Sequence, residues 1–205
     1  SFSVQDKLNI VKALDDFGVD YIEAGNPFSN PKDAVFFERV RGLRLKNAKL
    51  CAFGSTCRKG VAPFDDENVA ALLKANTETV TVFGKAWDLH VTEILRATLD
   101  ENLAIVENTV RYLKENNREA IFDAEHFFDG FAANPDYAFE VLHAAKRGGA
   151  DVLCLCDTNG GTAPLVLYEA VKRVCADFAG IHVAIHCHND AGCAIANSLL
   201  AVEAG

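Results

Sequence analysis

The feature that most constrains the fold is a repeated unit of about 30 residues, the length of one strand with one crossover helix. Runs of apolar residues begin at residues 21, 49, 79, 120, 151 and 181, so successive starts lie 28, 30, 41, 31 and 30 residues apart. These runs predict strands at Tyr21–Gly25, Lys49–Ser55, Thr79–Gly84, Ala120–Phe127, Asp151–Thr158 and Ile181–His188. The chain is therefore expected to consist of repeated βα units.

Amphipathic helices are predicted between the strands. The first, Lys7–Phe17, has apolar residues along one stripe, with Ser3 and Asp6 typical of a helix start and Gly18 of a helix end. Further helices are predicted at Leu95–Leu113, Pro135–Arg147 and Pro164–Phe178. The longest interval between strands leaves room for a loop at 85–92 before its helix.

The strand pattern favours a barrel over an open sheet. Runs such as Val152–Cys156 are apolar at every position, as expected of parallel strands buried on both faces. A dinucleotide-binding sheet would carry Gly-x-Gly-x-x-Gly after its first strand, and the sequence has no such motif there. In a barrel, the loops after the strands converge on one mouth. Polar residues do stand at these strand ends, namely Glu23, Ser55, Lys85, Glu125, Thr158, His186 and His188.

Six predicted strands are fewer than the eight of a closed barrel. We therefore predict an α/β fold that is a partial (β/α)8 TIM barrel, covering helix 1 through helix 7 with strands 2–7. The sequence contains no methionine and opens directly on a helix start. We expect residues 1–205 to be a single catalytic-barrel domain, truncated at both ends and taken from a longer polypeptide.

Composition excludes several other classes of protein. The net charge of −9 and the absence of a basic patch argue against binding to nucleic acid. No apolar run approaches the ~20 residues of a membrane span, and the first residues do not form an export signal. The seven cysteines lack paired zinc-ribbon spacing, which predicts free thiols and a cytoplasmic location.

The segment 185–192 is the most informative for chemistry. His186 and His188 are two residues apart on a predicted strand, so their imidazoles point to the same side. Asn189 and Gly192 then turn the chain toward a helix, with Asp190 as its predicted N-cap. Two imidazoles at a strand end can form half of a divalent-metal site. The alternative is a pair of interior histidines bonded to carbonyl groups.

This segment, with Ala196–Leu199, resembles the motif of the metal-dependent acyl-CoA condensing and lyase barrels. These include the 2-isopropylmalate, homocitrate and citramalate synthases and 3-hydroxy-3-methylglutaryl-CoA (HMG-CoA) lyase. Further motifs similar to theirs are Ile22–Gly25, Phe53–Thr56, Asp123–Phe127 and Cys156–Gly161. The segments Phe83–His90 and Ala124–Gly130 are most similar to the citramalate-synthase branch.

The resemblance implies a transferase that condenses acetyl-CoA with a short, pyruvate-like α-keto acid, using a divalent metal ion (Mn, Mg or Zn). It implies a cytoplasmic homodimer or larger homo-oligomer of branched-chain amino acid biosynthesis, with no nucleic-acid or membrane partner. The implied metal ligands are His186 and His188. The implied catalytic residues are Glu125, as the base or its partner, and Glu23, which orients an arginine. For substrate binding the residues are Thr158, Ser55 and Lys85.

Other interpretations of these residues and of the function stay open. Glu125 can instead be a structural carboxylate paired with Lys85 or Arg58, and Thr158 an ordinary turn residue. Cys154 and Cys156 share the parity of Thr158, so we expect them to be small core residues lining the barrel interior.

Two further functions compete with condensation. The same metal chemistry serves carbon–carbon bond cleavage in an HMG-CoA lyase-like or 4-hydroxy-2-oxovalerate aldolase-like enzyme. The chain as given can also be a non-catalytic fragment, because in the similar enzymes the remaining metal ligands and the arginine belong to the first and eighth strands.

Overall fold

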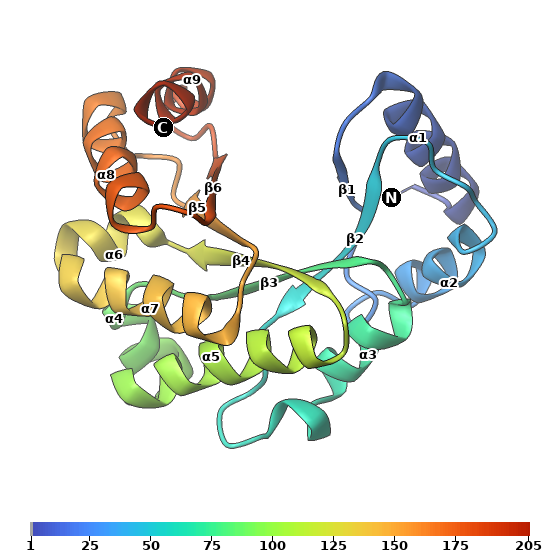
Figure 1. Ribbon diagram of the computed structural model, residues 1–205, viewed down its shortest axis with the longest axis horizontal. Coiled ribbons are helices and arrows are strands. Elements are labelled where there is room, and N and C mark those ends of the chain that lie inside the picture. The colour runs from blue at the N-terminus through green and yellow to red at the C-terminus, as the bar shows by residue number, and fades with distance from the viewer. Residues whose placement is uncertain (1) are drawn as a thin grey trace.

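The computed structural model describes residues 2–205, and its sheet has six parallel strands, each paired with the next along the chain. The strands curve into an open arc with the helices on its outer face (Figure 1). This arrangement confirms the predicted partial (β/α)8 barrel. Each strand end lies within two residues of its predicted position, the bounds being β1 (Tyr21–Glu23), β2 (Lys49–Ser55), β3 (Thr79–Lys85), β4 (Glu119–Glu125), β5 (Val152–Asp157) and β6 (His182–Cys187).

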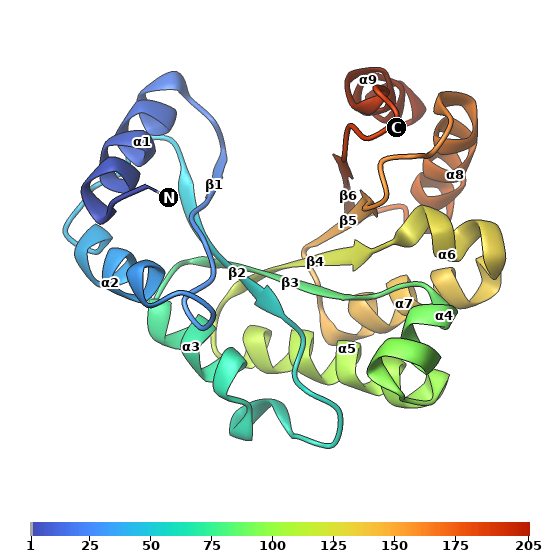
Figure 2. The same ribbon diagram turned by 180° about the vertical axis from the view of Figure 1, so that it is seen from behind.

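The helices cover the convex side of the sheet, as the view from behind also shows (Figure 2). Their bounds are α1 (Val4–Phe17), α2 (Pro31–Val40), α3 (Glu67–Ala75), α4 (Asp88–His90), α5 (Leu99–Glu115), α6 (Phe127–Ala133), α7 (Pro135–Gly148), α8 (Pro164–Asp177) and α9 (Ala194–Ala204). A 3-10 turn, η1 (Pro63–Asp65), precedes α3, and a π-helical turn, η2 (Val91–Leu95), follows α4.

The hydrophobic core lies between the sheet and these helices. Alternate strand residues such as Val80, Val82, Phe122, Leu153 and Leu155 are fully buried on the helix side. The other residues of each strand face the concave side, because side chains alternate along a strand. The concave face is consequently the surface on which a barrel enzyme gathers its functional groups at the carboxyl ends of the strands.

At the opposite, amino-terminal end of the concave face, Glu119 ties four strands together. Its carboxylate accepts hydrogen bonds from the hydroxyls of Tyr21 and Thr79, both at 2.7 Å, and from Lys49 Nζ at 3.0 Å. Burial disfavours the charge of Glu119, but these bonds outweigh it and hold the pKa of Glu119 below its ordinary value. This hydrogen-bond network connects β1 through β4 at the amino-terminal end of the strands, away from the predicted site.

The first helix ends at Phe17 as predicted and begins at Val4, three residues before the predicted range but directly after the predicted start signal at Ser3. Ser3 and Asp6 form a reciprocal capping box, and Gly18 ends α1 with a left-handed φ of 93°. The predicted start of the helix at Leu95 was wrong. Arg96 adopts a left-handed φ of 52°, which interrupts the helical path, and Thr98 caps α5 from Leu99 onward. The segment predicted as a loop at 85–92 contains α4 and the start of η2.

The two ends of the arc are open within residues 2–205, because the sheet order places β1 and β6 at its edges. Large apolar side chains are exposed beside both edges: Ile10, Leu14 and Phe17 on α1, and Ile195, Leu199 and Val202 on α9. All seven cysteines are free thiols. Among the described residues, no helix combines the length and apolar character that spanning a membrane requires.

Candidate functional site

A pocket of about 290 Å³ opens on the concave face at the carboxyl ends of the strands. It brings together four of the predicted site residues, Glu125, Thr158, His186 and His188. Its remaining lining residues are Phe53, Phe83, Asp123 and Cys156. The sheet register explains this grouping: Cys156 pairs with His186, so these two side chains lie side by side on adjacent strands.

His188 is held in a defined orientation by main-chain groups of β5 and the loop after it. Its Nδ1 lies 2.7 Å from the carbonyl oxygen of Thr158, and its backbone N–H donates to the carbonyl of Asp157 at 3.2 Å. A carbonyl can only accept, so Nδ1 is the donor and Nε2 keeps its lone pair. The ring of His186 lies 4.9 Å from that of His188, centroid to centroid.

The loops that follow β5 and β6 pack closely against each other. Ala191 donates its N–H to the carbonyl of Gly160 at 2.9 Å, and a side chain at Gly160 would approach within 2.5 Å of the Asp190 carboxylate. Asp190 was wrongly predicted as the N-cap of the following helix. The N-cap of α9 is Cys193, and the side chain that accepts from the N–H of Ala194, at 3.1 Å, is Asn189.

Glu125 forms an ion pair with Lys85 across the β3–β4 register. The two side chains are only 23% and 17% exposed, so this pair is well shielded from solvent. Of the two structural partners considered for Glu125, Lys85 is the one present, whereas Arg58 pairs with Asp66 and Glu67. Lys85 contacts Oε2 of Glu125.

Thr158 connects the pocket to β4 through its side chain. Its hydroxyl oxygen accepts from the backbone N–H of His126 at 2.8 Å. The hydroxyl proton therefore remains available to a ligand, because accepting one bond does not use the donor. His126 lies outside the pocket lining, with Nδ1 3.0 Å from Asp129 Oδ2 and its ring 4.4 Å from that of His90.

Asp123 is a pocket residue that was not among the predicted site residues. It is 7% exposed, and burial followed by the nearby charge of Glu23 raises its pKa to about 7. The neighbouring thiols of Cys154 and Cys156 partly oppose this rise in pKa. Asp123 stands two positions before Glu125, and this shared parity is the sequence feature that could have identified it.

The donors in the pocket fit a divalent ion. One ligand atom each from Asp123, Cys156 and His186 lie within 4.8 Å of one another, and His188 adds an imidazole nitrogen nearby. Oxygen, sulfur and nitrogen of these types are the usual protein ligands of zinc and related metals. Cys156, expected to be a small core residue, is buried as predicted and also lines the pocket.

The other three predicted site residues line other pockets. Glu23 lies on the edge strand β1 and lines a separate pocket of about 160 Å³ next to α1. Ser55 and Lys85 line a third pocket, of about 350 Å³, together with Arg58 and Lys59. Phe83 lines both this basic pocket and the histidine pocket, so the two are neighbours.

Known proteins similar to this chain agree with this architecture. The chain is 55% identical over its whole length to an (R)-citramalate synthase of Aquifex aeolicus and covers 39% of that relative. It is 35% identical over its whole length to a probable 2-isopropylmalate synthase of Methanopyrus kandleri and covers 38% of it. The chain thus spans about two fifths of the length of these curated relatives.

A solved structure shows the same fold. It is an HMG-CoA lyase from Acinetobacter baumannii in complex with coenzyme A and 3-methylmalate, with a TM-score of 0.77 at 20% identity. The match covers 98% of this chain and 65% of that one. A family model described as HMGL-like matches residues 1–205. The chain therefore belongs to the HMGL-like family.

Proposed function

We propose that the protein containing this chain condenses acetyl-CoA with a short α-keto acid such as pyruvate. The observation that carries the proposal is the gathering of His186, His188, Glu125 and Thr158 around one pocket, in a chain 55% identical to a citramalate synthase. The probable 2-isopropylmalate synthase at 35% identity supports the same reaction class, acyl transfer to a keto acid.

We further propose that the arc is part of a closed eight-stranded barrel, completed by strands outside residues 1–205. Edge strands in an open sheet present unpaired backbone groups, which proteins normally cover. The exposed apolar side chains of α1 and α9 flank the opening of the arc. By this proposal, residues 1–205 form most of a single catalytic domain and are inactive by themselves.

His186 and His188 are the residues that would hold a divalent metal ion, Mn, Mg or Zn, with further ligands from the missing strands. The Thr158 carbonyl supports this role because it leaves Nε2 of His188 free to coordinate. Bound there, the ion would act as a Lewis acid toward a carbonyl group.

The chain's own residues would supply the remaining steps. The free hydroxyl of Thr158 would donate a hydrogen bond to the carboxylate of the keto acid. Glu125 would accept a proton from the methyl group of acetyl-CoA on Oε1, while Lys85 holds Oε2. Phe53 and Phe83, stacked at 5.4 Å between ring centroids, would shield the groups that form the carbon–carbon bond from water. After that bond has formed, a water molecule would hydrolyse the thioester of the condensed product, which releases coenzyme A as a free thiol and leaves the hydroxy-diacid.

The basic pocket beside the site supports binding of an anionic coenzyme. Arg58, Lys59 and Lys85 line it and Ser55 adds a hydroxyl group, but each of the three cations is ion-paired with a carboxylate, so an anion would compete for them. Because the net charge of the chain is −9, an anion must be captured by such local groups. Glu23 would act at the edge of the mouth, orienting an arginine from a neighbouring strand. We place the assembled enzyme in the cytoplasm, as a homo-oligomer of branched-chain amino acid biosynthesis.

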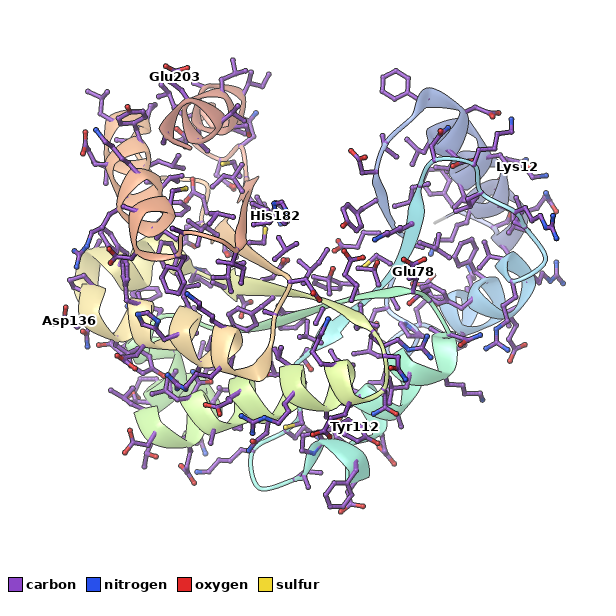
Figure 3. All side chains as sticks on the ribbon, viewed as in Figure 1. Lys12, Glu78, Tyr112, Asp136, His182 and Glu203 are labelled. Carbon is purple, nitrogen blue, oxygen red and sulfur yellow. The ribbon has the colours of Figure 1, made fainter. Side chains whose placement is uncertain are left out.

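The test is release of free thiol from acetyl-CoA by the full-length protein supplied with Mn²⁺ and a panel of keto acids. We expect a branched hydroxy-diacid product by mass spectrometry, and loss of thiol release in His186→Ala and His188→Ala. His182→Ala is the matched control, since His182 lies on the same strand and the same concave side but at its far end (Figure 3). The proposal fails if no keto acid supports thiol release, or if His182→Ala is as inactive as the other two.

Cleavage is the competing reaction, supported by the lyase fold at 20% identity. The same full-length protein would be given HMG-CoA or 4-hydroxy-2-oxovalerate, and the carbon–carbon cleavage products would be measured. We expect condensation to exceed cleavage at equal substrate concentration. Faster cleavage would replace the synthase proposal by the lyase one.

A further inference from the structure

The group Asp123, Cys156 and His186 contains a donor type that the proposed reaction does not use. The carboxylate oxygen, the thiol sulfur and the imidazole nitrogen come from three adjacent strands, and all lie within 4.8 Å of one another. Asp123 and Cys156 are 7% and 6% exposed, so both ligand atoms lie at the floor of the pocket. A carboxylate and a thiol buried this deeply beside an imidazole form a preorganised tridentate set.

The sheet register places this set below the histidine pair. Cys156 and His186 are register partners, whereas Asp123 pairs with Cys154, one inward-facing level nearer the amino-terminal end of the strands. His188 follows His186 by two residues, so it lies one inward-facing position nearer the carboxyl-terminal end of the strands. His186 is therefore shared between an upper pair, with His188, and a lower triad, with Asp123 and Cys156.

We propose that Asp123, Cys156 and His186 form a second metal position that selects thiophilic divalent ions such as Zn²⁺ and Cd²⁺ over Mn²⁺ and Mg²⁺. Three protein ligands from oxygen, sulfur and nitrogen leave one position open, the arrangement of an accessible rather than a closed structural zinc site. Hard ions favour oxygen and avoid thiolate, so the sulfur of Cys156 provides the selectivity.

Binding in the lower position is a proton exchange. The Cys156 thiol loses its proton to solvent as the Sγ–metal bond forms. The two positive charges of the ion neutralise the negative charges of the resulting thiolate and of the Asp123 carboxylate. Because one imidazole nitrogen cannot serve two ions, the lower ion removes His186 from the upper pair. Resting on the proposed function, thiophilic ions would therefore inhibit the reaction supported by Mn²⁺ or Mg²⁺ at the upper pair, because they withdraw His186 from the catalytic ion.

The experiment uses Co²⁺ as a spectroscopic probe on the full-length protein, first freed of metal with a chelator. A thiolate ligand gives Co²⁺ an intense near-ultraviolet charge-transfer band, which nitrogen and oxygen ligands do not give. We expect the band in the wild-type protein, its loss in Cys156→Ser, and at least about tenfold weaker Co²⁺ binding in Asp123→Asn. No substrate is present, so the result is independent of whether the proposed reaction occurs.

Cys187→Ser is the matched control, because Cys187 lies on the same strand as His186 but faces the helices. It should keep the band at wild-type strength. A second measurement needs no variant: crystals soaked in Zn²⁺ should show an anomalous peak bonded to Cys156 Sγ. The proposal is overturned if the wild type lacks the band, if Cys156→Ser retains it, or if the only zinc peak lies between His186 and His188.

Discussion

Gly148, the last residue of α7, packs directly against the backbone of α5. A Cβ added there would lie 2.6 Å from the carbonyl oxygen of Glu107 and 2.8 Å from Cβ of Val110. Neither atom is at the end of a flexible side chain, so neither can rotate away. Ordinary contacts begin at 3.4 Å, and Gly148→Ala therefore requires the two helices to separate by about 0.8 Å.

Two opposing energies decide the outcome of Gly148→Ala. Alanine favours a helix over glycine by up to ~1 kcal/mol, whereas overpacking a close interface costs ~1–3 kcal/mol. Because the obstructing atoms are rigid, the upper part of the second range applies, and the net loss in free energy of unfolding is about 2 kcal/mol. For a domain of this size that corresponds to a fall in Tm of about 4–8 °C.

Scanning calorimetry of the full-length protein measures this effect. The matched control is Gly42→Ala, because the nearest atom to a Cβ at Gly42 is 3.8 Å away, which is ordinary contact. Gly42→Ala should shift Tm by no more than about 1 °C. If Gly148→Ala were as stable as Gly42→Ala, helix propensity would outweigh the contact and the reasoning would be refuted.

Three further predictions concern charges and hydrogen bonds. Glu119→Ala removes the acceptor of three donors and should cost about 2 kcal/mol in urea unfolding, roughly twice the cost of Glu119→Gln; equal costs would contradict this. Hydrogen bonds from Arg147, and next from Arg111, lower the pKa of Glu107 in the folded protein below its ordinary value of 4.5. The stabilisation that ionised Glu107 gives to the fold is therefore complete above pH 4.5 and is lost as the pH falls through the lower pKa of the folded state. Urea midpoints of Glu107→Gln should therefore change less with pH there than those of wild type, and parallel curves would refute this. Thr158→Val deprives the N–H of His126 of its acceptor and should cost ~1–2 kcal/mol, whereas Thr158→Ser should unfold like wild type.

The strands could be predicted because their sequences are largely apolar, even in β1 and β6, which are exposed or half-buried at the edges of the sheet. Runs such as Val152–Cys156 need no knowledge of their partners to be recognised, and the βα period then orders them. The start of α5 could not be placed in this way. Arg96 adopts a left-handed conformation that non-glycine residues rarely take, so its residue type does not signal the interruption.

Strand parity, the alternation of side chains between the two faces of a strand, could predict which site residues share a face but not which of them share a pocket. Parity places Glu125 and His186 on one face, and both do line one pocket. Assignment of Ser55 and Glu23 to other pockets depends on the curvature of the whole sheet, which no local pattern encodes. Asp123 was not predicted because its role as a pocket residue depends on the thiols of Cys154 and Cys156 beside it, and the sequence does not show that these residues are neighbours.

The bond that orients His188 has a consequence for engineering the proposed activity. The acceptor is a main-chain carbonyl, which no single amino-acid substitution deletes. Imidazole tautomers in metal proteins are commonly set by a carboxylate, and mutation of that carboxylate unsettles the ligand. Here, a substitution at residue 158 changes the side chain at the pocket but leaves the acceptor of the His188 Nδ1 proton in place.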